Sequence, residues 1–477
     1  MNRRKTLVAA SILVAAAATL LTTAAASASP RHAAASYPRT LAGARTYLAS
    51  LGIDARTVVI QRGAQNYAGP NCPGRGWTCT TSKRVLQLGK DKNDVDCTGT
   101  GSVMGDTQTC TVIQGMPGQT TGRNNARCVE RSQSPAAVQV CSIEQNGAQN
   151  TALVIQEDVV GGNNDDEDDN AHASPGESPT QTADQTTEVT QTTGAGGTNS
   201  VSTSQRVLQN VHGGTDQSQN AHQELTINQN APGAGSNTST IEQDQRQNAY
   251  KGVTQSQNTS FSGTATPCPA ATLYGVGNNP NQCAFVHQGT DAGTNVNSAN
   301  QTLHEKERSQ AATDQLQGSF AGGVKLQADL DAGTGTSTNT VHQDKNQDAK
   351  GPAGVTQHQF DPMGCCGFSA QGNDQSTESL DQSSTQQASG GTAAVQQLEV
   401  FGFVHTPTGG TCSITQHASD NADSSTQSAS SADCTAGVGF FTDCTSGEIP
   451  EVELLVPTPA QETTPACTSA PFFGGGD

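Results

Sequence analysis

Apolar and polar residues alternate along much of this chain, most clearly between residues 141 and 156. In a β-strand alternate side chains share a face, so Cys141, Ile143 and Gln145 would point the same way. Gly147 then permits a turn. The next stretch alternates again and predicts a facing strand that presents Asn150, Ala152, Val154 and Gln156. We call this predicted strand–turn–strand unit a rung.

The same pattern recurs far along the chain, which indicates a protein built from repeats. Cys412 begins a second Cys-Ser-Ile-x-Gln segment, and Cys110 begins a looser one. Two longer copies start at Gly233 and Gly333 and contain Ile241 and Val341, which lie 100 residues apart. The repeat therefore has two scales, a short motif and a superrepeat.

A single rung buries too little surface to offset roughly 1–2 kcal/mol of backbone entropy per residue. Stacked rungs overcome this cost, because each backbone pairs with the next layer and identical Gln and Asn side chains form hydrogen-bonded ladders. We therefore expect an all-β fold, either a repeat-built β-solenoid or a cross-β stack, with a short N-terminal helix and disordered linkers.

The segment Gln-x-Gly-x-x-Asn-x-Ala-x-x-x-Gln from Gln145 to Gln156 resembles the repeat of curlin, the subunit of extracellular curli-type amyloid fibres. Gln61 to Ala68 matches its first half, and Gln416, Asn421 and Gln427 keep its Gln, Asn and Gln spacing. Here the matching segments are separated by long polar stretches and cysteines, whereas curlin rungs follow one another directly. Together, resemblance and internal repeats imply inward stacking positions at Gln61, Asn66, Ile143, Gln145, Asn150, Ala152, Gln156, Ile241, Gln243, Asn248, Val341, Gln343, Ile414, Gln416, Asn421 and Gln427.

The chain divides into five regions by composition. Residues 1–28 have a basic start, an apolar stretch and a small-residue cleavage box, which predict a secretory signal peptide. Residues 29–160 form an N-terminal cysteine-containing module with curlin-like rungs and a short helix over 41–51. An acidic and Ser/Pro/Thr-rich linker is expected at 161–197, three degenerate Gln/Asn-rich superrepeats at 198–445, and a Pro/Gly-rich tail at 446–477.

Fourteen cysteines in an exported chain indicate disulfides rather than metal ligands. A bridge between Cys128 and Cys141 would clamp neighbouring rungs, and Cys110 is the competing partner, which the sequence leaves open. Cys72 and Cys79 are expected to close a small loop. The full set of disulfide candidates is Cys72, Cys79, Cys110, Cys128, Cys141, Cys412 and Cys434.

Composition and charge narrow the function. Hydrophobic residues make up 32% of the chain and aromatic residues 4%, which is little material for an enzyme pocket. The net charge of −19 argues against nucleic acid and anionic membranes. No catalytic motif is found: His304 and Glu305 begin like a zinc-protease helix, but Arg308 stands where the second histidine is required.

We therefore expect no catalytic residue, metal or cofactor, and no membrane insertion after cleavage. The expected function is a secreted structural protein of an extracellular matrix, fibre or coat at the cell surface. Its expected partner is itself, through stacked Gln/Asn rungs, or other extracellular proteins or surface polymers. The alternative is a secreted or surface-attached β-solenoid binding module resembling an adhesin, and a secreted hydrolase is the remaining one.

Overall fold

The computed structural model describes the chain over residues 40–100, 107–161, 171–172, 180–213, 216–250, 254–257, 282–290, 292–308, 313–317, 321–329, 335–350, 355–369, 375–389, 394–406, 411–419, 424–435, 461–463 and 466–468. The described part is mostly β-strand, with a single α-helix and one 3-10 helix. The predicted signal peptide and the acidic run at 163–170 lie outside it. No described helix has the length and apolar character needed to cross a membrane.

The strands form two sheets, with 13 strands in sheet 1 and 14 in sheet 2. Sheet 1 contains, in spatial order, β1 (Val59–Gln61), β4 (Arg84–Gln87), β6 (Thr107–Gln114), β8 (Ala136–Asn146), β11 (Thr180–Thr192), β13 (Asp216–Asn230), β16 (Gln282–Gly289), β19 (Ala321–Asp329), β21 (Val355–Ser369), β23 (Ala394–Thr406) and β25 (Ser424–Thr435), with β15 (Thr254–Gln257) and β18 (Thr313–Gln317) beside this path.

Sheet 2 follows the same order along the stack. It contains β3 (Trp77–Thr80), β2 (Gln65–Ala68), β5 (Lys92–Thr100), β7 (Arg123–Ser132), β9 (Gln149–Val160), β12 (Thr198–His212), β14 (Ser236–Tyr250), β17 (Thr294–Arg308), β20 (Thr336–Lys350), β22 (Gln375–Ser389), β24 (Thr411–Ser419) and β26 (Gln461–Thr463), with β10 (Ala171–His172) and β27 (Ala466–Thr468) at its margins.

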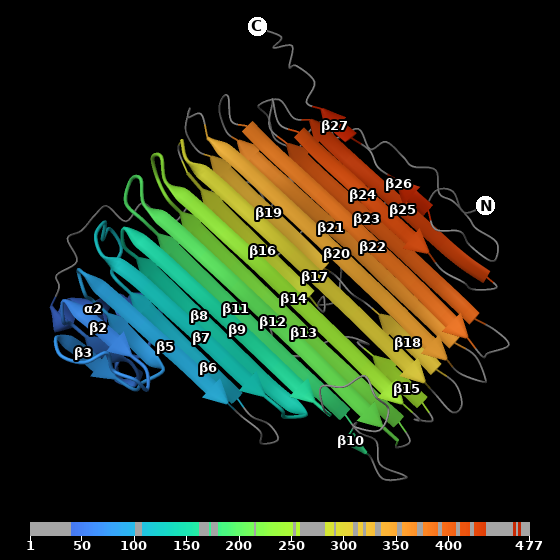
Figure 1. Cartoon of the computed structure of the whole chain (residues 1–477), viewed down its shortest axis with the longest axis horizontal. Helices are drawn as coiled ribbons and strands as arrows, with labels where there is room; N and C mark the ends of the chain where they lie inside the picture. Colours follow the sequence, from blue (N-terminus) through green and yellow to red (C-terminus); the bar gives the residue numbers. More distant parts are fainter. Residues whose placement is uncertain are drawn as a thin grey trace, which may run out of the picture.

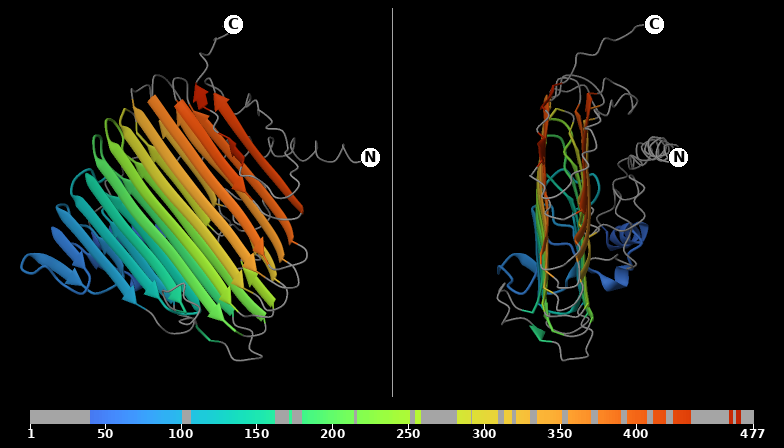
Figure 2. Two further views of the ribbon diagram at one scale, coloured as in Figure 1. Left: turned by 45° about the vertical axis from the view of Figure 1, so that its right-hand side comes forward. Right: turned by 90° about the vertical axis from the view of Figure 1, so that its right-hand side faces the viewer.

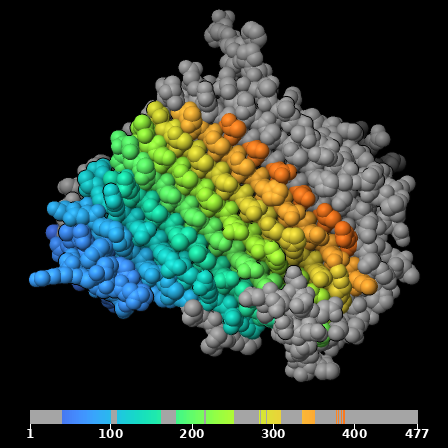
Figure 3. Space-filling model, viewed as in Figure 1, coloured from blue at the N-terminus to red at the C-terminus, as the bar shows by residue number. Residues whose placement is uncertain are grey.

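The chain alternates between the two sheets, and each long strand pairs in parallel with the strand one rung earlier. Only the pairings of β24 with β26 and β27 are antiparallel in the described part. Strands lengthen from three residues in β1 to 15 in β13, so the stack widens from its N-terminal end (Figure 1). In the space-filling view the described strands lie as parallel bands in sequence order (Figure 3).

The rung predicted at residues 141–156 is present. Strand β8 ends at Asn146 in sheet 1, Gly147 and Ala148 form the turn, and β9 starts at Gln149 in sheet 2. Every second residue of both strands is buried between the sheets, which face each other as two layers (Figure 2). This core is apolar at its centre, in a column that includes Val112, Ile143, Ala152, Val189 and Ile227.

The predicted helix is α2 (Leu41–Ser50), and Thr40 caps it by accepting a hydrogen bond from the Gly43 amide at 3.1 Å. It is followed by the 3-10 helix η1 (Ala55–Thr57). Tyr47 and Leu48 pack on an outward-facing apolar group that includes Leu86 and Ile113 of sheet 1. The helix therefore covers the outer face of the first strands and lies beside the two layers in the right-hand view of Figure 2.

The prediction of a linker at 161–197 is wrong over its second half. Residues Thr180–Thr192 form β11, which pairs in parallel with both β8 and β13. Inward positions of β11 include Ala183, Gln185 and Val189, all buried. These small and carboxamide side chains fit the core, so a Ser/Thr-rich segment without large apolar residues forms a central strand.

Candidate functional site: carboxamide ladders in the core

A ladder of glutamines runs through sheet 1 at the last inward position of each strand. Each amide nitrogen donates to the side-chain oxygen of the preceding rung at 2.7–2.9 Å. The described glutamines of this ladder are at most 3% exposed. Its members are Gln61, Gln87, Gln114, Gln145, Gln191, Gln229 and Gln288.

A ladder of asparagines runs through sheet 2 just after the turn. Each Nδ2 donates to Oδ1 of the next rung at 2.8–2.9 Å. The asparagines also bind the turn: Oδ1 of Asn66 accepts from the Gly63 amide and Oδ1 of Asn93 from the Gly89 amide, both at 2.9 Å. The members are Asn66, Asn93, Asn124, Asn150, Asn199, Asn237 and Asn295.

The asparagine ladder explains the glycine two residues after the glutamine. A Cβ at Gly89 would lie 2.5 Å from Asn93 Oδ1, and one at Gly147 would lie 2.6 Å from Asn124 Nδ2. A side chain at either position would displace a laddered carboxamide. The glycine of the Gln-x-Gly turn is therefore required to leave room for the ladder, whether two residues separate it from the asparagine, as at Gly147 and Asn150, or three, as at Gly89 and Asn93.

A second glutamine ladder occupies the middle of sheet 2. Gln343, Gln301, Gln243, Gln205 and Gln156 each donate to the preceding rung at 2.6–3.1 Å. The ladder begins on a carboxylate, because Gln156 donates to Glu130.

Two acidic side chains thus lie in the core near the start of this ladder. Glu130 is 2% exposed and Asp158 is fully buried. Burial raises the pKa of Glu130 to about 7, against the smaller opposing effects of its bond to Gln156 and of Lys83. Burial likewise raises the pKa of Asp158 to about 7, opposed by Ser132. Their ionisation is therefore coupled to the stability of the stack.

The sequence-predicted stacking residues of the first rungs occupy these ladders or the core beside them. Gln61 and Gln145 belong to the ladder of sheet 1, Asn66 and Asn150 to the asparagine ladder, and Gln156 to the second glutamine ladder. Ile143 and Ala152 lie in the apolar column between them.

The later copies of the motif occupy a different place in the rung from the one expected. Gln243 and Asn248 lie on one continuous strand, β14, with no turn between them. Gln243 is in register with Gln205, while Asn248 donates to Asn210 at 2.7 Å near the far end of the strand. The structural equivalent of Asn150 in this rung is Asn237. Ile241, Val341 and Gln343 are all buried on β14 or β20 of sheet 2.

The copy starting at Cys412 also lies in sheet 2, whereas the copy starting at Cys141 lies in sheet 1. Ile414 and Gln416 of β24 pair by register with Leu380 and Gln382 of β22. Gln427 lies in β25 of sheet 1. Asn421 lies outside the described residues. Strands of both sheets contain an apolar-x-Gln motif, Ile143-x-Gln145 in β8 of sheet 1 and Ile414-x-Gln416 in β24 of sheet 2. Because they share this motif, segments from opposite sheets align in sequence.

Several ladder members are missed by sequence reasoning, among them Gln87, Asn93, Gln191, Gln229 and Gln288. Successive glutamines of the first ladder are separated by 26 to 59 residues, so a search at a fixed period does not find them. Their common signal is a β-branched residue two positions before the glutamine, as at Val85, Val112 and Val189.

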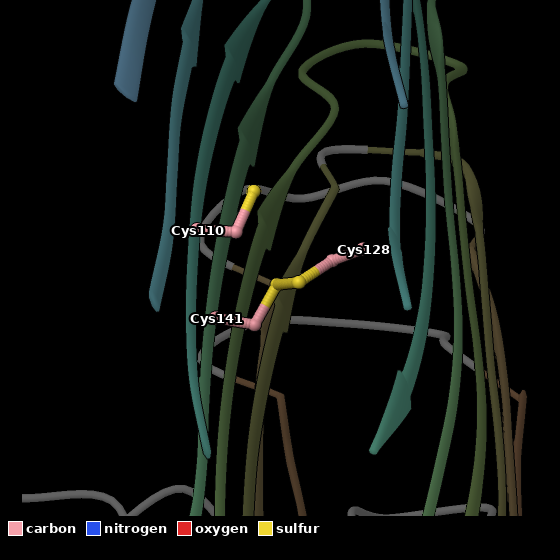
Figure 4. Close-up of side chains that lie close together, drawn as sticks. All are labelled: Cys110, Cys128 and Cys141. Atoms are coloured by element: carbon pink, nitrogen blue, oxygen red, sulfur yellow. A yellow bond between two sulfur atoms is a disulfide. The ribbon is translucent and has the colours of Figure 1, made fainter. Parts of the chain in front are cut away.

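Three disulfides join cysteines in the N-terminal rungs: Cys72–Cys79, Cys97–Cys110 and Cys128–Cys141. The first closes the small loop expected from sequence. The third connects β7 of one rung to β8 of the next, the clamp expected from sequence, and is drawn in Figure 4. Cys110, the competing partner, pairs instead with Cys97. Cys412 and Cys434 lie on β24 and β25, and their side chains are outside the described part.

The sulfur atoms of Cys110, Cys128 and Cys141 lie within 4.8 Å of one another, which is the spacing of a possible metal site (Figure 4). All three are engaged in disulfides, so their sulfurs are not thiolates free to bind an ion. In the parallel strand pairing, Cys97 lies beside Cys128 in sheet 2 and Cys110 lies beside Cys141 in sheet 1. The disulfides Cys97–Cys110 and Cys128–Cys141 therefore cross the core in adjacent layers.

Comparison of the chain with protein-family models, with curated proteins and with solved structures gives no match. The geometry itself defines two parallel sheets with hydrogen-bonded carboxamide columns between them. This arrangement holds identical side chains in register from rung to rung.

Proposed function

We propose that the chain is a β-solenoid of curlin-like rungs that is exported and serves as a non-catalytic structural component of an extracellular matrix, fibre or coat. In this function its partners are other copies of itself, added at the ends of the stack. The carboxamide ladders carry the proposal. They repeat the same buried hydrogen bond in successive layers, and a further layer with the same side chains would extend both ladders and sheets.

The ends of the stack differ in their capacity to add strands. Strand β25 has 12 residues and pairs only with β23 among the described strands, so one of its edges is unpaired there. An unpaired edge of that length is a template for another chain. At the other end the edge strands β1 and β3 have only three and four residues. We therefore propose that association begins at the broad C-terminal end.

The disulfides support an oxidising setting outside the cytosol, since paired cysteines of this density are rare in reducing compartments. The net charge of −19 opposes association at neutral pH and low salt. Protonation of carboxylates near pH 4, or added salt, reduces this repulsion.

The test is negative-stain microscopy and analytical ultracentrifugation of the protein without residues 1–28, at pH 4 and 7.5 and at low and high salt. We expect assemblies that form faster in acid or in high salt. A matched chain ending at Thr435 lacks β26 and β27, which cover β24, and should assemble faster still. A protein that stays monomeric under all conditions, in both forms, contradicts the proposal.

A further inference from the structure

The outer face of sheet 2 is divided into two halves of different chemistry. On β12, β14, β17 and β20, the first three outward positions after the turn form a block of four strands by three columns. Eleven of its twelve residues are serine or threonine, and the twelfth is Val296. The members of this hydroxyl array are Thr198, Ser200, Ser202, Ser236, Thr238, Thr240, Thr294, Val296, Ser298, Thr336, Thr338 and Thr340.

The next three outward positions on the same four strands provide an internal comparison. Only Ser204 and Thr302 carry hydroxyls there, and seven of the twelve residues are ionisable. These twelve are Ser204, Arg206, Leu208, Glu242, Asp244, Arg246, Asn300, Thr302, His304, His342, Asp344 and Asn346. The preference of strands for threonine acts equally on both halves, so it does not explain the difference.

The hydroxyl array is a two-dimensional lattice fixed by the backbone. Parallel pairing puts Thr198, Ser236, Thr294 and Thr336 in the first column, with neighbours about 4.8 Å apart. Along a strand, outward residues repeat at about 6.6 Å. Long sheets normally twist, and side-chain ladders are one of the devices that hold them flat. Behind the first column of this array runs the asparagine ladder, at Asn199 in β12.

Nine of the array's twelve residues are exposed and the other three are half-buried, and none is charged although the protein is strongly acidic. Thr240, Ser298 and Thr340 of its third column are exposed, as are Thr294 and Thr336 of its first. No aromatic side chain lies in it, so it lacks the ring platforms on which a sugar would stack. Its repeat of about 4.8 by 6.6 Å is close to the spacing of water molecules in an ice surface.

We propose that the hydroxyl array binds the surface of ice. The regular hydroxyls replace lattice hydrogen bonds of surface water, and the threonine methyl groups fill the spaces between them. Each contact is weak, but a rigid array makes many of them at once, so the whole array binds far more strongly than any single hydroxyl. This inference depends on the described sheet geometry and not on self-association, and a protein that never assembles would still bind ice.

The experiment measures inhibition of ice recrystallisation and thermal hysteresis with the full mature chain. Thr240→Tyr places a ring in the third column of the array, on one of its two middle strands, and Glu188→Tyr places the same ring at an exposed position on the outer face of sheet 1 as a control. Circular dichroism and unfolding midpoints of both variants establish that they fold. The wild type and Glu188→Tyr should inhibit ice growth equally, and Thr240→Tyr should need at least about tenfold more protein, about 1.4 kcal/mol.

A parallel arm measures sedimentation of the same three proteins with microcrystalline cellulose and chitin. Wild-type protein without effect on ice growth overturns the proposal. Equal activity of all three proteins on ice also overturns it, because binding would then lie elsewhere. Thr240-dependent binding to a polysaccharide without activity on ice reassigns the array to that polymer and rejects ice as its ligand.

Discussion

Gln145 provides the sharpest test of the carboxamide ladders. Its side chain is fully buried and donates to Gln114 Oε1 at 2.7 Å and to the Thr151 carbonyl at 2.8 Å. It also accepts from Gln191 Nε2 at 2.7 Å. Gln145→Ala removes all three bonds and leaves Gln114 Oε1 without this donor.

The cost follows from these contacts. A buried polar group deprived of its partner costs about 1–3 kcal/mol, and each of the other hydrogen bonds contributes roughly 1 kcal/mol. We therefore expect Gln145→Ala to destabilise the protein by about 3 kcal/mol or more. Gln149→Ala, four residues away, is the control, because Gln149 is exposed and surface changes stay within about 0.5 kcal/mol.

Asn146, the last residue of β8 before the turn, is unsuitable as a second control. It is 4% exposed and donates to Glu144 Oε1 at 3.1 Å, beneath the part of sheet 1 that α2 covers. Asn150→Ala is a better companion, since it breaks the neighbouring ladder in both directions and should also cost about 3 kcal/mol.

The assay is urea unfolding followed by far-ultraviolet circular dichroism and by fluorescence of Trp77, the only tryptophan, in edge strand β3. Stacked repeats can unfold in stages, so two probes are needed to define the transition. Equal midpoints for Gln145→Ala and Gln149→Ala would refute the ladder as a source of stability.

Three further predictions concern other parts of the stack. The carboxyl of Glu130 has its ordinary pKa of 4.5 in the unfolded chain, whereas burial raises its pKa to about 7 in the folded protein. The free energy of unfolding should therefore fall as pH rises between these two values. In unfolding measured at pH 5 and 8, Glu130→Gln should remove about 3 kcal/mol of that loss of stability. Paired substitution of Cys128 and Cys141 by serine should cost about 3 kcal/mol, and peptide mapping of the unreduced protein should recover this bridge; free thiols there would contradict it. Leu48→Ala should cost about 2–5 kcal/mol and speed proteolysis within 40–58, whereas Leu51→Ala, at an exposed position, should change neither.

Sequence alone predicts the local unit better than the global register. The alternation at 141–156 and the turn at Gly147 follow from period-two burial and backbone freedom, and both are present in the structure. The short helix at 41–51 follows in the same way from its apolar spacing and from Gly52, whose φ is +73°. Each depends on neighbours within a few residues.

Pairing between rungs is a long-range property, and here sequence analysis errs. Gln145 is laddered to Gln191, 46 residues away, across the acidic run and the Ser/Pro/Thr segment. Connections of unequal length change the spacing without changing the strands. Similar apolar-x-Gln segments in both sheets then align with each other, as those at Gln145 and Gln416 do.

The widening of the strands implies an order of events as the protein forms. Each long strand pairs with one made only tens of residues earlier, a local topology that favours rapid folding. The narrow end is nearest the N-terminus and carries all three described disulfides, so once these have formed it presents a template of fixed shape to the longer strands. In a chain exported N-terminus first, each later strand would meet its pairing partner already in place, and folding would advance from the N-terminal end.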